Sequence, residues 1–148
     1  MKTLVIRKGE RLTIRAIATV TDDPRRDRCE TLAFFEEHAG LRPKEFEKLS
    51  ALLTDTAKNG PPPDETKFKD LPGTDDLYEF KTSGGLRLIC FKDDGALIIC
   101  THGYLKDGRK LPKREQERAE RLKKIYFLDK AAGTLTHGEP KKPTLRKL

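Results

Sequence analysis

The chain contains 148 residues, of which 37% are charged and 35% hydrophobic, and it carries a formal net charge of +7. Its length suits a single domain. No apolar run approaches the roughly 20 residues of a membrane span, and residues 1–7 lack the long apolar region of a secretion signal. The excess of positive charge favours a polyanionic partner, which is nucleic acid, an acidic protein or an anionic membrane surface.

The N-terminal half combines a strand pattern with two helix patterns. Residues 3–7 and 11–20 alternate imperfectly between apolar and polar side chains around residues 8–10, which predicts a β-hairpin. Apolar residues at helical spacing predict one helix from about residue 26 to 38, closed by Gly40, and a second from Pro43 to Asn59. Both helices are amphipathic and a short loop joins them, so we expect an antiparallel pair on one side of a sheet.

The C-terminal half is dominated by strand patterns. Residues 66–73 form an extended basic segment and a turn, and residues 77–81 and 86–91 are predicted strands. The most apolar strand, residues 96–101, is expected at the centre of the sheet. Asp94-Gly95 suits the hairpin turn before it, since such turns require positive φ angles.

One more helix is predicted near the C-terminus. It begins at Pro112, which is suited to a first helical position, and continues to about residue 128. Its buried face is expected to contain Ala119, Leu122, Ile125 and Tyr126. We therefore predict one domain over residues 1–132, with its core at 66–128, followed by a basic, loosely ordered tail over residues 133–148.

The cysteines carry no metal-site pattern. Cys29, Cys90 and Cys100 are few and lack the spacing of metal ligands. We expect reduced, buried thiols in a cytoplasmic protein, with no metal and no cofactor. Cys90 and Cys100 flank a turn on adjacent strands, so a disulfide between them is an alternative.

The hairpin turn allows two polar residues to be placed relative to each other. With a two-residue turn at Asp94-Gly95, counting back along both strands sets Arg87 opposite His102. Directly opposed residues of an antiparallel pair point to the same face, so a guanidinium and an imidazole would share one surface patch. A three-residue turn would shift the register by one and separate the two side chains.

Each of these residues has a structural and a functional interpretation. Arg87 lies in an apolar strand. Its structural interpretation is an edge residue or the partner of a carboxylate such as Glu79, and its functional interpretation is a fixed cation for a phosphate. His102 is either a packing residue or a proton donor and acceptor. Lysines and a tyrosine nearby favour binding of RNA, whose backbone lysines neutralise and whose bases stack on aromatic rings. Lys67 and Lys69 alternate with Phe68 and would lie on one face of an extended strand, where the alternative is a solvated sheet edge.

Four short motifs between residues 67 and 124 are specific in combination. They are Lys69-Asp70-Leu71, Leu77-Tyr78-Glu79-Phe80-Lys81, Leu86-Arg87-Leu88-Ile89 and Thr101-His102-Gly103-Tyr104-Leu105-Lys106, with Lys110, Pro112 and Glu115 downstream. In this order they resemble the RelE/ParE superfamily of type II toxin–antitoxin toxins, and most closely its HigB-like, phage-related branch.

The resemblance implies both a fold and an activity. The fold would be α+β, with a RelE-like twisted antiparallel sheet, an N-terminal helical hairpin on one face, a C-terminal helix and a basic concave face opposite the hairpin. Many such toxins are ribosome-dependent endoribonucleases that cut mRNA without a metal, by driving the 2′-hydroxyl onto the adjacent phosphate. The implied partners are mRNA, the ribosome and a cognate antitoxin of helix-turn-helix type, with no membrane.

The resemblance also implies roles for individual residues. Arg87 and Lys69 would stabilise charge on the phosphate, and His102 would act as acid or base. The remaining residues would bind the RNA strand and its bases; they are Lys67, Lys81, Tyr104, Lys106 and Lys110.

The sequence departs from the superfamily pattern at several points. Asp107 stands where a second lysine is usual, Lys81 replaces an arginine, and the chain is longer than a typical member. Two alternative functions therefore remain: a ParE-like toxin that acts on DNA gyrase without nuclease activity, and a catalytically silent nucleic-acid-binding relative.

Overall fold

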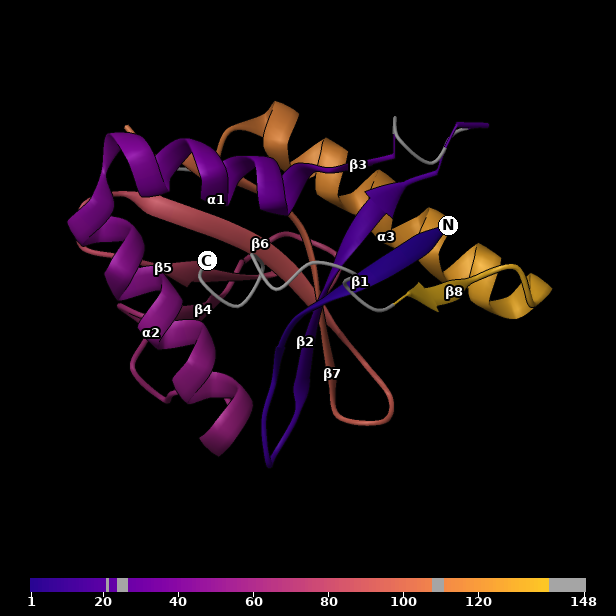
Figure 1. Ribbon diagram of the computed structural model, residues 1–148, viewed down its shortest axis with the longest axis horizontal. Coiled ribbons are helices and arrows are strands. Elements are labelled where there is room, and N and C mark those ends of the chain that lie inside the picture. The colour runs from indigo at the N-terminus through magenta and orange to yellow at the C-terminus, as the bar shows by residue number, and fades with distance from the viewer. Residues whose placement is uncertain (21, 24–26, 108–110, 139–148) are drawn as a thin grey trace.

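One mixed sheet forms the centre of the molecule and carries helices on both faces (Figure 1). The computed structural model describes residues 1–20, 22–23, 27–107 and 111–138. The helices are α1 (Glu30–Leu41), α2 (Pro43–Asn59) and α3 (Lys113–Ala132). The strands are β1 (Lys2–Lys8), β2 (Thr13–Thr19), β3 (Arg28–Cys29), β4 (Phe68–Asp70), β5 (Tyr78–Lys81), β6 (Leu86–Asp93), β7 (Leu97–Leu105) and β8 (Thr136–Gly138).

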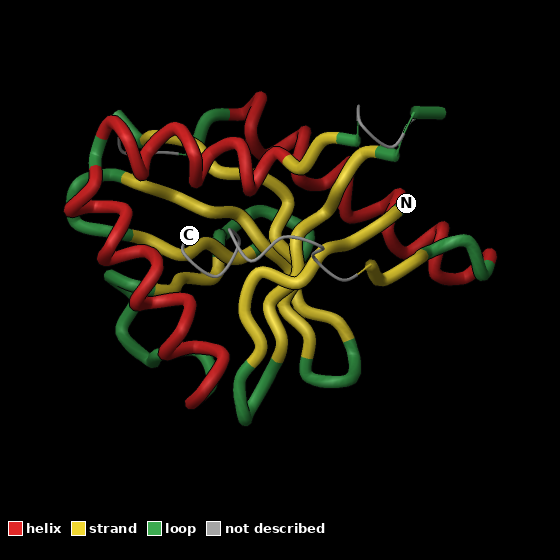
Figure 2. Tube along the Cα trace, in the orientation of Figure 1, coloured by secondary structure: helices red, strands yellow, loops and turns green. Residues whose placement is uncertain are grey.

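The sheet differs from the expected antiparallel one. Its strand order is β4-β5-β6-β7-β2-β1-β8, with β3 paired to β2. The hairpins β1–β2 and β6–β7 are antiparallel, but β2 runs parallel to β7 and β8 runs parallel to β1. The two hairpin loops consequently project from the same end of the sheet (Figure 2). The prediction of a purely antiparallel sheet was therefore wrong, because pairing between distant strands leaves no trace in local sequence patterns.

Two hydrophobic cores lie on opposite faces of the sheet. On one face α1 and α2 pack Phe35 and Leu49 onto β6 and β7, which confirms the predicted helix pair. On the other face α3 packs Ala119 and Tyr126 onto β6 and β7. The face opposite the helical hairpin, which was expected to be basic and concave, therefore carries α3.

Most predicted elements are present, with shifted ends. α1 begins at Glu30 rather than near residue 26 and passes through Gly40, and α2 has the predicted bounds. α3 extends beyond residue 128 to Ala132. Ile125 on this helix is 40% exposed, so its predicted burial was wrong.

The predicted register of the β6–β7 hairpin was also wrong. Asp93 pairs with Leu97, so the turn contains three residues, and Ala96 takes a positive φ of 58°. A bulge between Ile89 and Cys90 then shifts the register again. Arg87 consequently lies opposite Tyr104 rather than His102, which lies opposite Ile89.

The longer turn and the bulge each shift the register by one residue, so Arg87 and His102 still lie on the same face of the sheet, as predicted. Alternate residues of a strand point to the same side, so Arg87 and Ile89 share a face with His102 and Tyr104 opposite them. That face is the one covered by α3. Since β7 continues to Leu105, His102 lies within the strand and not at its end.

Gly103 is required by the packing of α1 on β7. A Cβ atom at this position would lie 2.3 Å from the ring of Phe34. The glycine beside His102 therefore allows the close approach of α1 and has a structural explanation.

The segment after α3 joins the sheet. Thr136–Gly138, predicted to be part of a loosely ordered tail, pairs with Lys2–Leu4 as β8. The rest of that tail, residues 139–148, lies outside the described residues. Among the described helices, none combines the length and apolar composition that a bilayer span requires.

The predicted burial of the cysteines is confirmed. Cys29, Cys90 and Cys100 are all buried and have free thiols, and Cys90 lies opposite Cys100 in the β6–β7 ladder. Burial raises the pKa of all three thiols, so they favour the unreactive protonated form.

Candidate nucleic-acid interface

A pocket of about 300 Å³ brings three lysines together at the β4–β5 end of the sheet. Lys69 comes from β4, Lys81 from the end of β5, and Lys106 from the segment after β7. The rest of its wall consists of Leu71, Pro72, Glu79, Leu111 and Gln116. Three cations facing one carboxylate give this lysine pocket the charge of an anion-binding site.

Glu79 lies at the back of the lysine pocket and is only 2% exposed. Its position in β5, opposite Lys69 of β4, turns its side chain toward the α3 face. Its Oε2 accepts a hydrogen bond from the Tyr104 hydroxyl at 3.0 Å, and its Oε1 lies 3.6 Å from Nε of Arg87. The buried carboxylate is therefore paired on two sides, as a charge in a protein interior must be.

Arg87 is held in place by its own neighbourhood. Its Nη1 donates to the carbonyl oxygens of Thr82 at 2.8 Å and Leu86 at 3.0 Å. It lies opposite Lys81 in the sheet, and its side chain is 12% exposed. The carboxylate partner proposed from the sequence, Glu79, is present in the structure. Arg87 thus contributes positive charge behind the lysine pocket, with Nη1 hydrogen-bonded to backbone carbonyls and a buried Nε that has no hydrogen-bond partner among the described residues.

Lys81 is the most perturbed cation of the lysine pocket. Burial lowers its pKa, and the positive charges of Arg87, Lys69 and Lys106 lower it further, against the opposing effect of Glu79. A bound anion would relieve this repulsion. Lys81 is therefore a group that releases its proton more readily than an ordinary lysine.

Tyr104 lies beneath the surface rather than on it. The residue is 7% exposed and belongs to the core under α3. Burial and the neighbouring carboxylate of Glu79 raise the pKa of its hydroxyl. In this arrangement its ring packs in the core, and a stacked base would reach it only after α3 had moved.

His102 is buried between β7 and α3, with 1% of its surface exposed. Its Nδ1 lies 3.2 Å from Oγ1 of Thr101, and its Nε2 lies 3.6 Å from Oε1 of Glu115 in α3. Burial lowers the pKa of His102 to about 4, with a further contribution from the charge of Arg118. The imidazole is therefore neutral at pH 7 and is not part of the lysine-pocket wall.

Of the other two lysines predicted to bind RNA, Lys67 is not among the residues that line the lysine pocket. Lys67 lies in the turn before β4 and lines a neighbouring hollow together with Lys81. Lys110 lies outside the described residues. In the described part of the chain, no group of three or more histidine, cysteine, aspartate or glutamate side chains could hold a metal ion.

Two polar wall residues, Glu79 and Gln116, were missed as members of a site. Glu79 was considered only as a partner for Arg87, although a carboxylate inside an apolar strand pattern is itself a sign of a paired, buried charge. Gln116, whose Nε2 donates to the carbonyl oxygen of Gly73 at 3.3 Å, joins the β4–β5 loop to α3. Nothing in its local sequence distinguishes it from an ordinary surface glutamine.

Comparison with known proteins supplies the family. A search of curated proteins finds no match to the chain. Residues 36–124, more than half of the sequence, match the family described as phage derived protein Gp49-like (DUF891). This range includes α2, strands β4 to β7 and every wall residue of the lysine pocket. The chain therefore belongs to the phage-derived Gp49-like family.

Proposed function

We propose that the protein is the toxin of a type II toxin–antitoxin module, in the HigB-like branch of the RelE/ParE superfamily. In this proposal it is a metal-independent endoribonuclease that cleaves mRNA on the ribosome. A small antitoxin of helix-turn-helix type, encoded beside it, would neutralise it. The observation that carries the proposal is the lysine pocket, in which Lys69, Lys81 and Lys106 surround a small space backed by Arg87.

The lysine pocket has the chemistry that phosphate cleavage needs. When a 2′-hydroxyl attacks the adjacent phosphate, negative charge develops on the phosphate oxygens, and ammonium groups fixed around it stabilise that charge. The attacking 2′-hydroxyl must give up its proton to a base, the role that the resemblance leaves to His102, and the 5′-oxygen that leaves must receive a proton. Lys81 is our candidate donor, because its lowered pKa favours release of a proton. Lys69 and Lys106 would hold the phosphate, and Glu79 would keep Arg87 in place.

The role of His102 as acid or base remains a prediction, and this role would require α3 to move. Its Nε2 faces Glu115 of α3, so the first turns of α3 would have to move before RNA could reach the ring. The buried, neutral histidine is also the observation that favours the second candidate function. A ParE-like gyrase inhibitor or a silent RNA-binding relative needs no acid or base at the surface.

Replacing Lys81 with methionine should reduce mRNA cleavage by about 100-fold, the effect typical of losing one group that stabilises transition-state charge. Cleavage would be measured with purified ribosomes and a defined message, by mapping the ends of the products. Lys44→Met is the matched control, because it removes one charge from an exposed position on α2, outside the lysine pocket.

We expect the wild type and the Lys44→Met variant to cleave the message equally. The Lys81→Met variant should cleave it about 100-fold less. Equal cutting by both variants would refute the lysine pocket as the site. An uncut message in the presence of wild-type protein would refute the nuclease, and DNA damage signalling with intact mRNA would then support the gyrase alternative.

A further inference from the structure

A second hollow, of about 520 Å³, lies next to the lysine pocket, between α2 and the end of β5. We call it the α2–β5 groove. One wall is formed by α2, and the other by the segment between α2 and β4 together with the turn after β5. The lining residues are Lys48, Ala51, Leu52, Asp55, Pro62, Thr66, Lys67, Lys81, Thr82 and Ser83.

The groove has an apolar floor with a cationic rim. Ala51, Leu52 and Pro62 supply aliphatic surface, and Lys67 and Lys81 supply positive charge. The carboxylate that also lines the groove, Asp55, accepts a hydrogen bond from Asn59 at 2.8 Å. Small-molecule sites in proteins have the same composition, mostly apolar with a few polar groups, and volumes of roughly 300–1,000 Å³. The groove therefore suits a ligand with one flat, weakly polar part and one anionic part.

Lys81 connects the groove to the lysine pocket, because it lines both of them. Its backbone N–H donates to the carbonyl oxygen of Lys67 at 2.8 Å, which fixes the two lysines side by side at the sheet edge. Lys69 follows two residues later in β4. The cations thus continue from the pocket past Lys81 into the groove, as neighbouring phosphates of one strand would require.

We propose that the α2–β5 groove binds one unpaired nucleotide of an RNA strand whose neighbouring phosphate lies in the lysine pocket. The base packs against Ala51, Leu52 and Pro62, and the nucleotide's own phosphate contacts Lys67 and Lys81. The proposal rests on the proposed function in taking RNA as the ligand and the lysine pocket as the site of its phosphate. It adds a subsite that reads a base next to the cleavage position.

Two hydroxyl groups that line the groove can contact the edge of the base. The Thr66 side chain donates to Asp64 at 2.7 Å, and Ser83 accepts from Lys48 at 3.2 Å, so both hydroxyls are fixed by neighbours. Fixed polar groups beside an apolar surface give orientation and some preference among bases.

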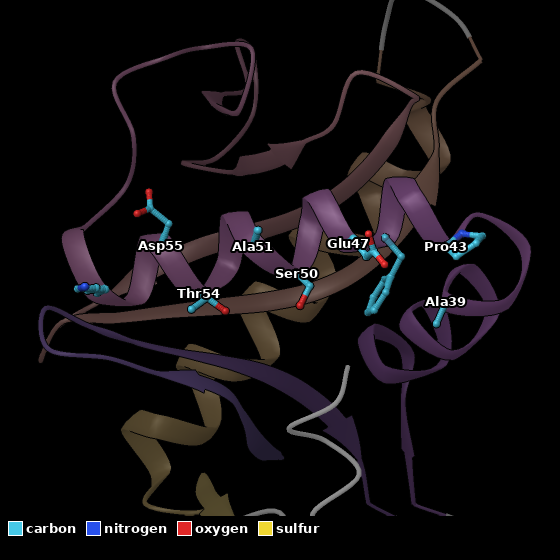
Figure 3. Close-up of a pocket in the computed structure, with 9 residues that line it drawn as sticks. Ala39, Pro43, Glu47, Ser50, Ala51, Thr54 and Asp55 are labelled. Carbon is cyan, nitrogen blue, oxygen red and sulfur yellow. The ribbon is translucent and has the colours of Figure 1, made fainter.

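A larger hollow on α2 provides the control surface. It has a volume of about 610 Å³ and follows the exposed side of the helix, where Figure 3 shows Glu47 and other residues that line it. In this view Ala51 and Asp55 point to the side of the segment that follows α2, whereas Ser50 and Thr54 point to the side of the β1–β2 hairpin. Ala51 lines both hollows, but Glu47 lines only this one.

The test measures binding of the full-length protein to a labelled single-stranded RNA by fluorescence anisotropy, without ribosomes and at low salt. A series of RNAs carries one abasic nucleotide at each position in turn. For the wild type, the dissociation constant should rise about tenfold at one position and less than about twofold elsewhere, because one base loses its apolar contact.

Ala51→Phe fills the groove from an exposed helical position and should abolish this position dependence, whereas Glu47→Phe should preserve it. In a second comparison, Lys67→Met should reduce the slope of the logarithm of the binding constant against the logarithm of the salt concentration by about one. Lys58→Met, on the control surface, should leave this slope unchanged. An unchanged abasic profile in Ala51→Phe, a uniform profile in the wild type, or no RNA binding would each overturn the proposal. Failure of the ribosome assay alone would remove the nuclease and leave this binding result intact.

Discussion

Replacing Glu79 with alanine is expected to lower the free energy of unfolding by about 3 to 5 kcal/mol, the cost typical of breaking a buried ion pair from one side. The reason is the burial of its partners. Arg87, 12% exposed, would lose the carboxylate that lies 3.6 Å away, and the buried Tyr104 hydroxyl would lose its acceptor at 3.0 Å. Urea unfolding followed by circular dichroism measures the change.

Two further variants separate the ion pair from simple loss of volume. Glu79→Gln keeps an acceptor for Tyr104 but not the charge, so its destabilisation should be smaller than that of Glu79→Ala. Arg87→Met combined with Glu79→Ala should cost less than the sum of the single changes, because no uncompensated charge remains. Additive effects would contradict a direct Glu79–Arg87 interaction.

Acidification should destabilise the protein through His102. Its pKa in the folded protein is about 4, below the value of about 6.5 expected in an unfolded chain. The unfolded state therefore binds the proton first. The stability contributed by the neutral ring is complete above pH 6.5 and is lost as the pH falls to about 4, where the loss reaches about 3 kcal/mol.

The measurement is the free energy of unfolding at pH 7.5 and pH 4.5, for the wild type and for His102→Gln. The variant should lose about 2 to 3 kcal/mol less than the wild type between these two pH values. His38→Gln is a second histidine variant for comparison, since burial also lowers the pKa of that histidine, which packs against Phe34 away from α3. Identical pH dependence in wild type and His102→Gln would show that His102 is not buried in a neutral form.

The local elements could be predicted from the sequence because their patterns are local. The Pro43–Asn59 helix has an apolar face, an N-terminal proline and a glycine after it, and it appears with those bounds. The turn at Asp94-Gly95 was found but its length was not, because Ala96 adopts a positive φ that its residue type does not favour. The bulge after Ile89 is likewise set by packing of the two strands and has no marker in the sequence.

Part of the candidate site could also be predicted from the sequence, namely its lysines. Lys69, Lys81 and Lys106 were predicted to bind RNA or its phosphate, and they line one pocket because β4, β5 and the end of β7 lie close together at this end of the sheet. The burial of His102 and Tyr104 depends on α3 folding back across the sheet. A tertiary contact of this kind cannot be read from the spacing of residues along β7.

In the proposed reaction, the lysine pocket directs a 2′-hydroxyl of mRNA onto the adjacent phosphate. The most direct measurement replaces that single 2′-hydroxyl by hydrogen in a ribosome-bound message, at the nucleotide 5′ of the mapped cut. The wild-type protein should cut the unmodified message, leaving a 2′,3′-cyclic phosphate, and should leave the deoxy-substituted position intact. Equal cutting of both messages at that position would contradict the claim.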